Sequence, residues 1–158
     1  MSEKIIKSSK RVKDHAEVYT PSWLVKDMLD LIPEMTWKDI DATFLEPSAG
    51  NGNFVVQILE RKLGICNTAD ERKRALQSIY AIELLEDNLV EMKERMREII
   101  HKYGGIDEAD IIIERNIQQG DFLKMIKNDG SDIKFYDWRG GTGYHSLKSV
   151  VQTQQTLF

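Results

Sequence analysis

The hydrophobic positions change their spacing several times along the chain, and each change marks the border of an expected element. The first periodic stretch follows Thr20 and Pro21, which suit the N-cap and the first turn of a helix. Its apolar face repeats at i, i+3, i+4 and i+7 through Val25, Met28, Leu29 and Ile32. Pro33 is expected to stop this helix, because proline lacks the amide hydrogen that a further turn needs.

The middle of the chain alternates between strand and helix patterns. "ATFLE" and "SIYAIEL" are apolar runs of strand length, the second typical of a sheet covered on both faces. A helix is expected after each run, with apolar stripes at Val55, Val56, Leu59 and Leu63 and at Leu85, Leu89, Met92, Met96 and Ile99. Between them, Thr68 and Glu71 have the spacing of a capping box, and Gly104 or Gly105 is expected to end the second helix.

The last third of the chain carries weaker patterns. "ADIIIERNIQQGDFL" indicates a third strand that runs into a loop, and 133–138 indicates a further strand before a last helix and a polar tail. The alternation of helix and strand predicts an α/β fold with a parallel sheet. At 158 residues this is one domain, which we place at 17–138, between a basic polar arm at 1–16 and a tail at 139–158.

Composition narrows the classes of protein to consider. Hydrophobic residues make up 41% and charged residues 30% of the chain, with a formal net charge of -4. A large nucleic-acid footprint would usually make the chain basic, so any such contact must be local. Cys66 is alone, and the three histidines have no metal-ligand spacing. No signal peptide or membrane-length apolar run is present, so we expect a cytoplasmic protein without membrane contact.

The segment "FLEPSAGNGNF" joins the first strand to its helix through two glycines. Gly50 and Gly52 can take positive φ and would let a ligand approach the backbone, at the sheet edge where α/β proteins bind ligands. A tight strand-to-helix connection explains the same residues equally well. Glu83 closes the second strand, where an acid can accept hydrogen bonds from ribose hydroxyls. Asp121 and Phe122 follow the third strand, where an acceptor and a ring would suit adenine.

Glu83 could also be a solvated acid at the end of a strand, and Asp121 a turn residue or N-cap. The four segments "VYTP", "FLEPSAGNGNF", "YAIEL" and "GDF", in this order, nevertheless resemble those of S-adenosylmethionine-dependent N6-adenine DNA methyltransferases. The modification subunits of type I restriction-modification systems and similar phage or type II enzymes are the most similar. The resemblance covers about residues 16–124 and implies a Rossmann-like methyltransferase fold that binds S-adenosyl-L-methionine.

The resemblance also assigns roles to individual residues. It implies that a first group closes over the methionine part of the cofactor, namely Tyr19, Thr20 and Pro21. A second group would form the methionine-binding loop, with Glu46 facing the ammonium group, and comprises Glu46, Ala49, Gly50 and Gly52. Glu83 matches the ribose acid, and Asp121 with Phe122 the adenine-binding pair.

The catalytic motif of this family is missing from the sequence. The family carries Asn or Asp, two prolines and an aromatic residue after its fourth strand, whereas all three prolines here lie at or before Pro47. Asp137 and Trp138 offer an acceptor and a ring without those prolines, and a simple turn explains them better. We therefore expect no catalytic residue and no target-recognition region in this chain. It would act on DNA only with a companion methyltransferase chain or as a homodimer, or it is an inactive relative.

The two ends of the sequence suggest further contacts. The last five residues, "QQTLF", resemble the peptide by which bacterial DNA-processing proteins bind the replication sliding clamp, with Gln154, Leu157 and Phe158 as the anchoring positions. A frayed terminus, or a tail helix packed on the core, is the alternative. The basic segment "KIIKSSKRVK" could contact phosphate, although a solvated arm is the more frequent outcome for such a segment.

Overall fold

The computed structural model describes residues 5–15, 17–141 and 143–149, and it has an α/β architecture. Its central sheet is parallel, with the order β1 (Phe44–Glu46), β2 (Ile79–Glu83) and β3 (Ile117–Gln119). The register places Phe44 opposite Ile79 and Ala81 opposite Ile117. The α/β class and the parallel sheet are therefore confirmed, and the arrangement is compatible with a Rossmann-like fold.

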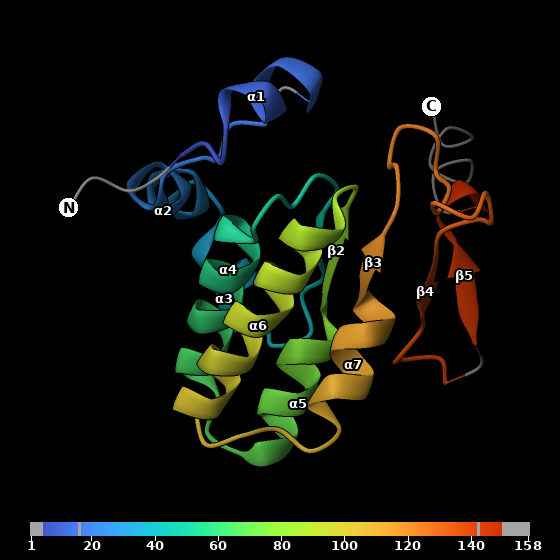
Figure 1. Cartoon of the computed structure of the whole chain (residues 1–158). Coiled ribbons are helices and arrows are strands. Elements are labelled where there is room, and N and C mark those ends of the chain that lie inside the picture. Colours follow the sequence, from blue (N-terminus) through green and yellow to red (C-terminus); the bar gives the residue numbers. More distant parts are fainter. Residues whose placement is uncertain (1–4, 16, 142, 150–158) are drawn as a thin grey trace.

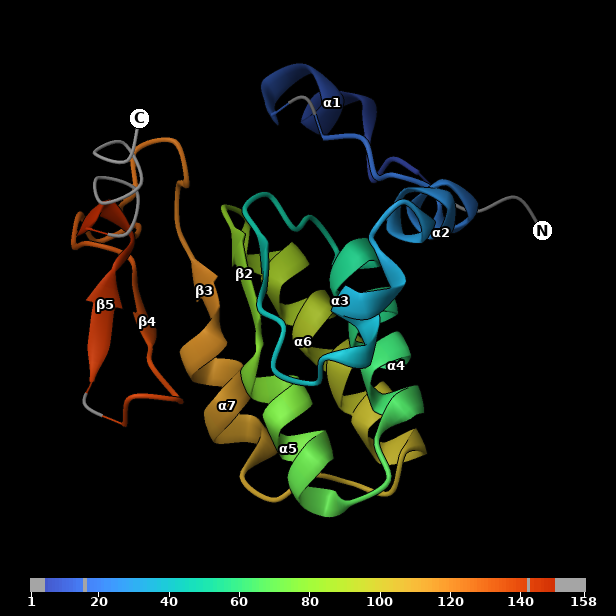
Figure 2. The same ribbon diagram turned by 180° about the vertical axis from the view of Figure 1, so that it is seen from behind.

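The helices α4 (Asn53–Ile65) and α6 (Glu86–Lys102) pack against each other on one face of this sheet (Figure 1). They are joined to α5 (Ala69–Gln77) and α7 (Ala109–Asn116), which pack side by side beneath them. The view from behind shows β2 in front of α6 (Figure 2). These four helices and the segment that carries Val25 and Leu29 contribute to one apolar core, which packs against the sheet.

The apolar stripes of α4 and α6 face this core as their spacing predicts. Leu59, Met92 and Met96 have no exposed surface, because the two helices pack these side chains against each other and the sheet. Two positions differ from the expected stripe: Leu85 is the half-buried N-cap of α6, and Ile100 is buried while Ile99 is half-buried. The stripe therefore turns slightly around α6 toward its C-terminal end.

The capping signals of α5 and α6 are confirmed. Thr68 Oγ1 accepts a hydrogen bond from the Glu71 amide, and the Glu71 carboxylate accepts one from the Thr68 amide, each at 3.1 Å. At the end of α6, Gly104 and Gly105 both have positive φ. The Gly105 amide donates to the Ile100 carbonyl at 2.9 Å, and this is the bond of a Schellman motif that spans the larger number of residues.

The first long helix differs from its predicted start and surface. In α2 (Ser22–Asp30) Pro21 is the N-cap, and the helix has no side-chain cap, so the predicted N-cap role of Thr20 is wrong. Val25 and Leu29 are buried, but 46% of Met28 is exposed. Pro33 starts an unpredicted short helix, α3 (Glu34–Lys38), because its fixed φ is also suited to the N-terminus of a helix.

The predicted third strand is mostly a helix. Residues 109–116 form α7, and only Ile117–Gln119 form β3. A short run of isoleucines fits a buried strand or one face of a buried helix, and here Ile112 and Ile113 face the core while 49% of Ile111 is exposed. Asp110 in the first turn and Arg115 in the last turn complement the helix dipole.

After β3 the chain forms an antiparallel pair of strands, β4 (Lys134–Tyr136) and β5 (Tyr144–Ser146). The predicted strand at 133–138 is confirmed at its centre, whereas β5 lies where no strand was expected. Leu147, only 3% exposed, packs with Ile82 and Ile133 in a second small core. The packed part of the chain therefore continues past the domain boundary expected at Trp138.

Candidate functional site

The glycine loop connects the carboxyl end of β1 to the start of α4. Gly50 has a φ of 55° and Gly52 a φ of 89°, both in the left-handed region that favours glycine. The Ala49 amide donates to the Ile82 carbonyl at 3.0 Å, which fixes the loop against the end of β2. Gly52 is the N-cap of α4, so the first amides of that helix lie directly beyond the loop.

Glu83 holds this loop in place. Its carboxylate accepts hydrogen bonds from the amides of Gly50 at 2.7 Å and Leu85 at 2.9 Å, and from Asn88 Nδ2 at 3.3 Å. The residue is only 6% exposed. A carboxylate offers about four acceptor positions, so one remains for a further donor. The acid that was expected to bind ribose therefore has a structural role, and it lies against the glycine loop as the sequence predicted.

The two glycines are required for different reasons. A Cβ at Gly50 would lie 3.3 Å from Cδ1 of the Tyr19 ring, which packs against the loop. A Cβ at Gly52 would lie 2.5 Å from Cγ of Met92, inside the core. The expectation that Gly52 leaves space for a ligand is therefore wrong: α6 fills that space.

Tyr19 connects the N-terminal segment to the loop and to α6. It is 7% exposed, and its hydroxyl donates to Asn88 Oδ1 at 2.8 Å, with Glu17 Oε1 as a second acceptor at 3.0 Å. Burial, and then the neighbouring Glu17 carboxylate, raise the pKa of the Tyr19 phenol to about 12. The ring is thus fixed at the centre of the site in its neutral form.

Tyr19 lines two small cavities, each of about 170 Å³. They share four lining residues, Val18, Tyr19, Ser48 and Gly50. The first cavity also contacts Thr20, Glu46 and Ala49, and the second also contacts Glu83 and Asn88. Most of the residues predicted to bind the cofactor are therefore brought together, although each cavity alone is smaller than the roughly 300 Å³ at which small-molecule pockets begin.

Glu46 is the acid of the first cavity. Burial raises the pKa of its carboxyl group, an effect that the hydrogen bond from the Ser48 amide to Oε1, at 3.2 Å, only partly offsets. Within the described ranges this carboxylate has no ion pair. A cationic group entering the cavity would therefore find a half-buried acid without a counterion.

The predicted adenine-binding pair does not join this site. Asp121 Oδ1 accepts a hydrogen bond from the Lys124 amide at 3.1 Å, and Lys124 Nζ lies 3.2 Å from Asp121 Oδ2. These two contacts lower the pKa of the Asp121 carboxyl group. The ring of Phe122 packs in the second core, against Ile82, Ile133 and Leu147. Neither residue lines the two cavities, so Asp121 has the alternative role of a turn residue.

Asp137 and Trp138 lie at the opposite end of the sheet. The Trp138 indole donates to Oδ1 of Asn116, which immediately precedes β3, at 2.8 Å. The Asp137 carboxylate accepts from the amides of Arg139 and Gly140 at 2.9 and 3.0 Å. These two residues therefore lie at the amino ends of the strands, away from the cavities beside Tyr19.

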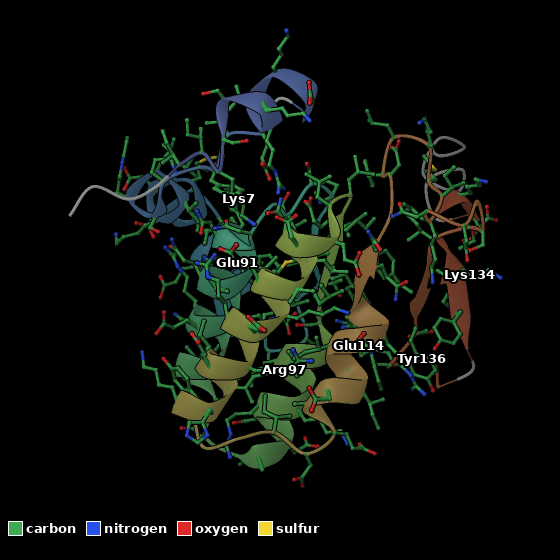
Figure 3. All side chains as sticks on the ribbon, in the orientation of Figure 1. Lys7, Glu91, Arg97, Glu114, Lys134 and Tyr136 are labelled. Carbon is green, nitrogen blue, oxygen red and sulfur yellow. The ribbon has the colours of Figure 1, made fainter. Side chains whose placement is uncertain are left out.

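Two cations of the basic arm, Lys7 and Arg11, are paired with acids of the protein itself. It includes α1 (Ser9–His15), which lies above the carboxyl ends of the strands in Figure 1. Lys7 Nζ lies 3.0 Å from carboxylate oxygens of both Asp87 and Glu91, and the Lys7–Glu91 pair can be followed in Figure 3. Arg11 pairs with Glu17 and Asp87 and lowers the pKa of Asp87 to about 2. These two cations hold the arm over the second cavity, so they are not free to bind phosphate.

Two residues of the site carried no signal in the sequence. Asn88, 1% exposed, contacts Lys7, Tyr19, Glu17 and Glu83 through its side-chain amide. Arg95 donates to the Asn51 carbonyl at 2.7 Å and to Asn53 Oδ1 at 2.9 Å, and so supports the glycine loop from α6. Both occupy ordinary polar positions of an amphipathic helix, where nothing in a single sequence distinguishes them.

The residues proposed to bind a sliding clamp, Gln154, Leu157 and Phe158, lie outside the described residues. In the part of the chain that the structure describes, no helix combines the length and the apolar character needed to cross a membrane.

Comparisons with protein-family models, with curated proteins and with solved structures found no match.

Proposed function

We propose that this chain binds S-adenosyl-L-methionine across the two cavities beside Tyr19 and takes part in N6-adenine methylation of DNA. The observation that carries the proposal is the position of two acids, Glu46 and Glu83, in adjoining cavities at the carboxyl ends of β1 and β2. The glycine loop lies between them and contacts both cavities through Gly50. This is the edge of a parallel sheet at which α/β proteins bind nucleotides.

The residues present suit the two ends of the cofactor. Glu46 would accept the ammonium group of the methionine part, because an unpaired half-buried carboxylate gains most from a cationic partner. The remaining acceptor position of Glu83 would take a ribose hydroxyl. Bound S-adenosylmethionine would supply an electrophilic methyl group. Because neither cavity alone is large enough, the ligand has to span both, with Tyr19, Thr20 and Pro21 covering the methionine part.

The adenine end and the DNA substrate require groups that we have not located in this chain. Asp121 and Phe122 face other partners, and Asp137 and Trp138 lie at the far end of the sheet. In the described residues β1 pairs only with β2, so its outer edge is open to a further strand. We infer that a companion methyltransferase chain or a second copy completes the enzyme, and that this chain alone binds the cofactor without methylating DNA.

Calorimetric titration with S-adenosylmethionine tests the cofactor site. Saturable binding is expected, and Glu46→Gln should weaken it by roughly tenfold to a hundredfold, since a charge-assisted hydrogen bond is lost. Glu98→Gln, an exposed acid on α6, is the matched control and should bind normally. Absence of binding, or equal affinity in the Glu46 variant, would contradict the proposal. Methylation of adenine in DNA by the chain alone would show that it needs no companion.

The C-terminal peptide supports a second candidate function, that of a module which binds the bacterial sliding clamp without catalysing a reaction. A tail can bury a leucine and a phenylalanine in an apolar groove while its glutamine makes polar contacts. The full chain should retain the clamp in a pull-down experiment, and deletion of 154–158 should abolish retention. Replacing Thr153 and Thr156 by serine is the matched control. Retention of the clamp after the deletion would rule out this use of the tail.

A further inference from the structure

A larger cavity lies at the opposite end of the sheet, at the amino ends of β1 and β2. Its volume is about 360 Å³, and it is lined by Thr43 and Ser78, which immediately precede the two strands. Trp138 and Arg139, from the loop after β4, complete its wall. The volume falls near the lower end of the range for small-molecule pockets, which suits a ligand of about one nucleotide. This cavity shares no lining residue with those beside Tyr19.

The cavity is positively charged although the chain as a whole is acidic. Arg74 and Arg139 both line it, and the only acid in its wall is Asp41, which is paired with Arg74 through two contacts. That pairing lowers the pKa of Asp41, so its carboxylate is committed to Arg74. Arg139 forms no ion pair within the described ranges; its Nη2 reaches only Thr43 Oγ1, at 3.4 Å. One guanidinium is therefore available to an anion.

The loop that carries Arg139 is fixed by its own hydrogen bonds. Asp137 Oδ1 accepts from the Arg139 amide at 2.9 Å and from the Gly140 amide at 3.0 Å. These bonds fix the backbone that follows β4. Arg139 therefore lies at the cavity before a ligand binds, and no long loop has to become ordered on binding. Preorganisation of this kind reduces the entropy that binding must overcome.

Two aromatic rings form the apolar part of the wall. The polar atoms of both are already used: the Trp138 indole donates to Asn116 Oδ1 at 2.8 Å, and the Tyr80 hydroxyl donates to the Tyr136 carbonyl at 3.1 Å. The rings are therefore held in position and offer carbon surface rather than donors. Aromatic side chains beside a cationic group are the combination that binds a nucleobase and its phosphate.

We propose that this cavity binds a nucleotide phosphate monoester, with the phosphate on Arg139 and Thr43 and the base against Trp138 and Tyr80. Phosphate is favoured because a guanidinium fork matches two of its oxygens, and the Thr43 hydroxyl can donate to a third. The side-chain amide of Gln77, also in the wall, provides a further donor. The site is independent of the one proposed for S-adenosylmethionine.

Calorimetry with cytidine 5′-monophosphate tests this site, since a pyrimidine nucleotide avoids the adenosine site proposed at the other end of the sheet. The wild-type chain should bind it more tightly than cytidine or inorganic phosphate, each by about tenfold or more. Arg139→Ala should weaken binding by roughly tenfold to a hundredfold, and Arg139→Lys by less, because lysine keeps the charge but not the fork. Arg97→Ala, which removes a surface arginine from α6 (Figure 3), should bind like the wild type.

Arg139 is exposed, so its variants should keep the melting temperature of the wild type. Equal affinity in the Arg139→Ala variant, or no saturable binding of cytidine monophosphate, would overturn the proposal. Inorganic phosphate binding as tightly as the nucleotide would overturn the role of the base. A 5′-phosphorylated single-stranded oligonucleotide separates two sources of this chemistry: competition with cytidine monophosphate assigns the site to a DNA end, and lack of competition assigns it to a free nucleotide.

Discussion

Gly52→Ala should lower the free energy of unfolding by about 2–5 kcal/mol, the largest effect we expect from a single added methyl group in this chain. Two penalties combine at this position. An L-residue at the φ of 89° observed for Gly52 costs about 1–2 kcal/mol. The added Cβ would also lie 2.5 Å from Cγ of Met92, a fully buried side chain, and overpacking of this kind typically costs about 1–3 kcal/mol.

A second glycine separates the two penalties. Gly104 has a φ of 88°, and a Cβ there would meet no atom within 4 Å. Gly104→Ala should therefore cost only the conformational part, and the difference between the two alanine variants measures the clash with Met92. Denaturant unfolding monitored by circular dichroism provides both values. Equal destabilisation by the two substitutions would show that Met92 does not occupy the space beside Gly52.

Because the Gly52 variant is expected to be unstable, it is unsuitable for testing ligand binding at the loop. Any loss of affinity for S-adenosylmethionine would reflect unfolding rather than a lost contact. Glu46 lines the cavity from the end of β1 and is part of neither core, so Glu46→Gln is the informative variant. S-adenosylmethionine binding is therefore best tested with a Glu46 variant and not with a Gly52 variant.

Lys62→Met should flatten the rise in stability that we expect between pH 8 and 10.5. Lys62 is 1% exposed, and its ammonium group donates to the Ala42 carbonyl at 2.8 Å and the Asp39 carbonyl at 3.4 Å. Burial lowers the pKa of this group from 10.5 to about 8. Between these two values the unfolded chain binds the proton and the folded chain does not, so the free energy of unfolding increases as pH rises.

The expected contribution of Lys62 is on the order of 1–3 kcal/mol over this pH range. Below pH 8 both states are protonated and the penalty of burying the charge is fully present. The difference between the pH profiles of wild type and variant reports Lys62 together with its effect on the neighbouring Cys66 thiol, whose pKa is raised by burial. Tyr19 and Tyr80, with pKa values near 12, are present in both proteins. Lys38→Met, at an exposed lysine of α3, should leave the pH profile unchanged. Parallel profiles for wild type and the Lys62 variant would contradict the prediction.

The sequence predicted the elements whose pattern is local. The helix with Met92 and Met96 in its stripe, the capping box at Thr68 and the strand ending at Glu83 all formed where expected. Each depends on residues within about one or two helical turns, so the necessary information is contained in a short stretch of chain. The isoleucine run at 111–113 fits two elements equally well, and only packing against the core decided for a helix.

The sequence predicted one part of the candidate site correctly and another part wrongly. Convergence of the glycine loop and Glu83 follows from parallel strands with adjacent carboxyl ends, and the Gly50–Glu83 hydrogen bond of 2.7 Å agrees with it. The position of Asp121 could not follow from that rule, because a carboxylate two residues beyond the end of a strand can accept hydrogen bonds from its own turn. The chain after β3 then returns toward the amino ends of the strands, and it carries Trp138 away from the cavities beside Tyr19.

By itself, the sequence determined the α/β class, the order of the main helices and strands, and the edge of the sheet at which to look for a ligand. These properties depend on periodicity, capping and turn residues, which act over short distances along the chain. The tertiary structure alone decided that Met92 occupies the space beside Gly52, that Asn88 joins the arm to the site, and that Arg139 enters a cavity with Thr43. Such contacts join residues 40 to 96 positions apart, and no local pattern specifies which distant side chains fill a given space.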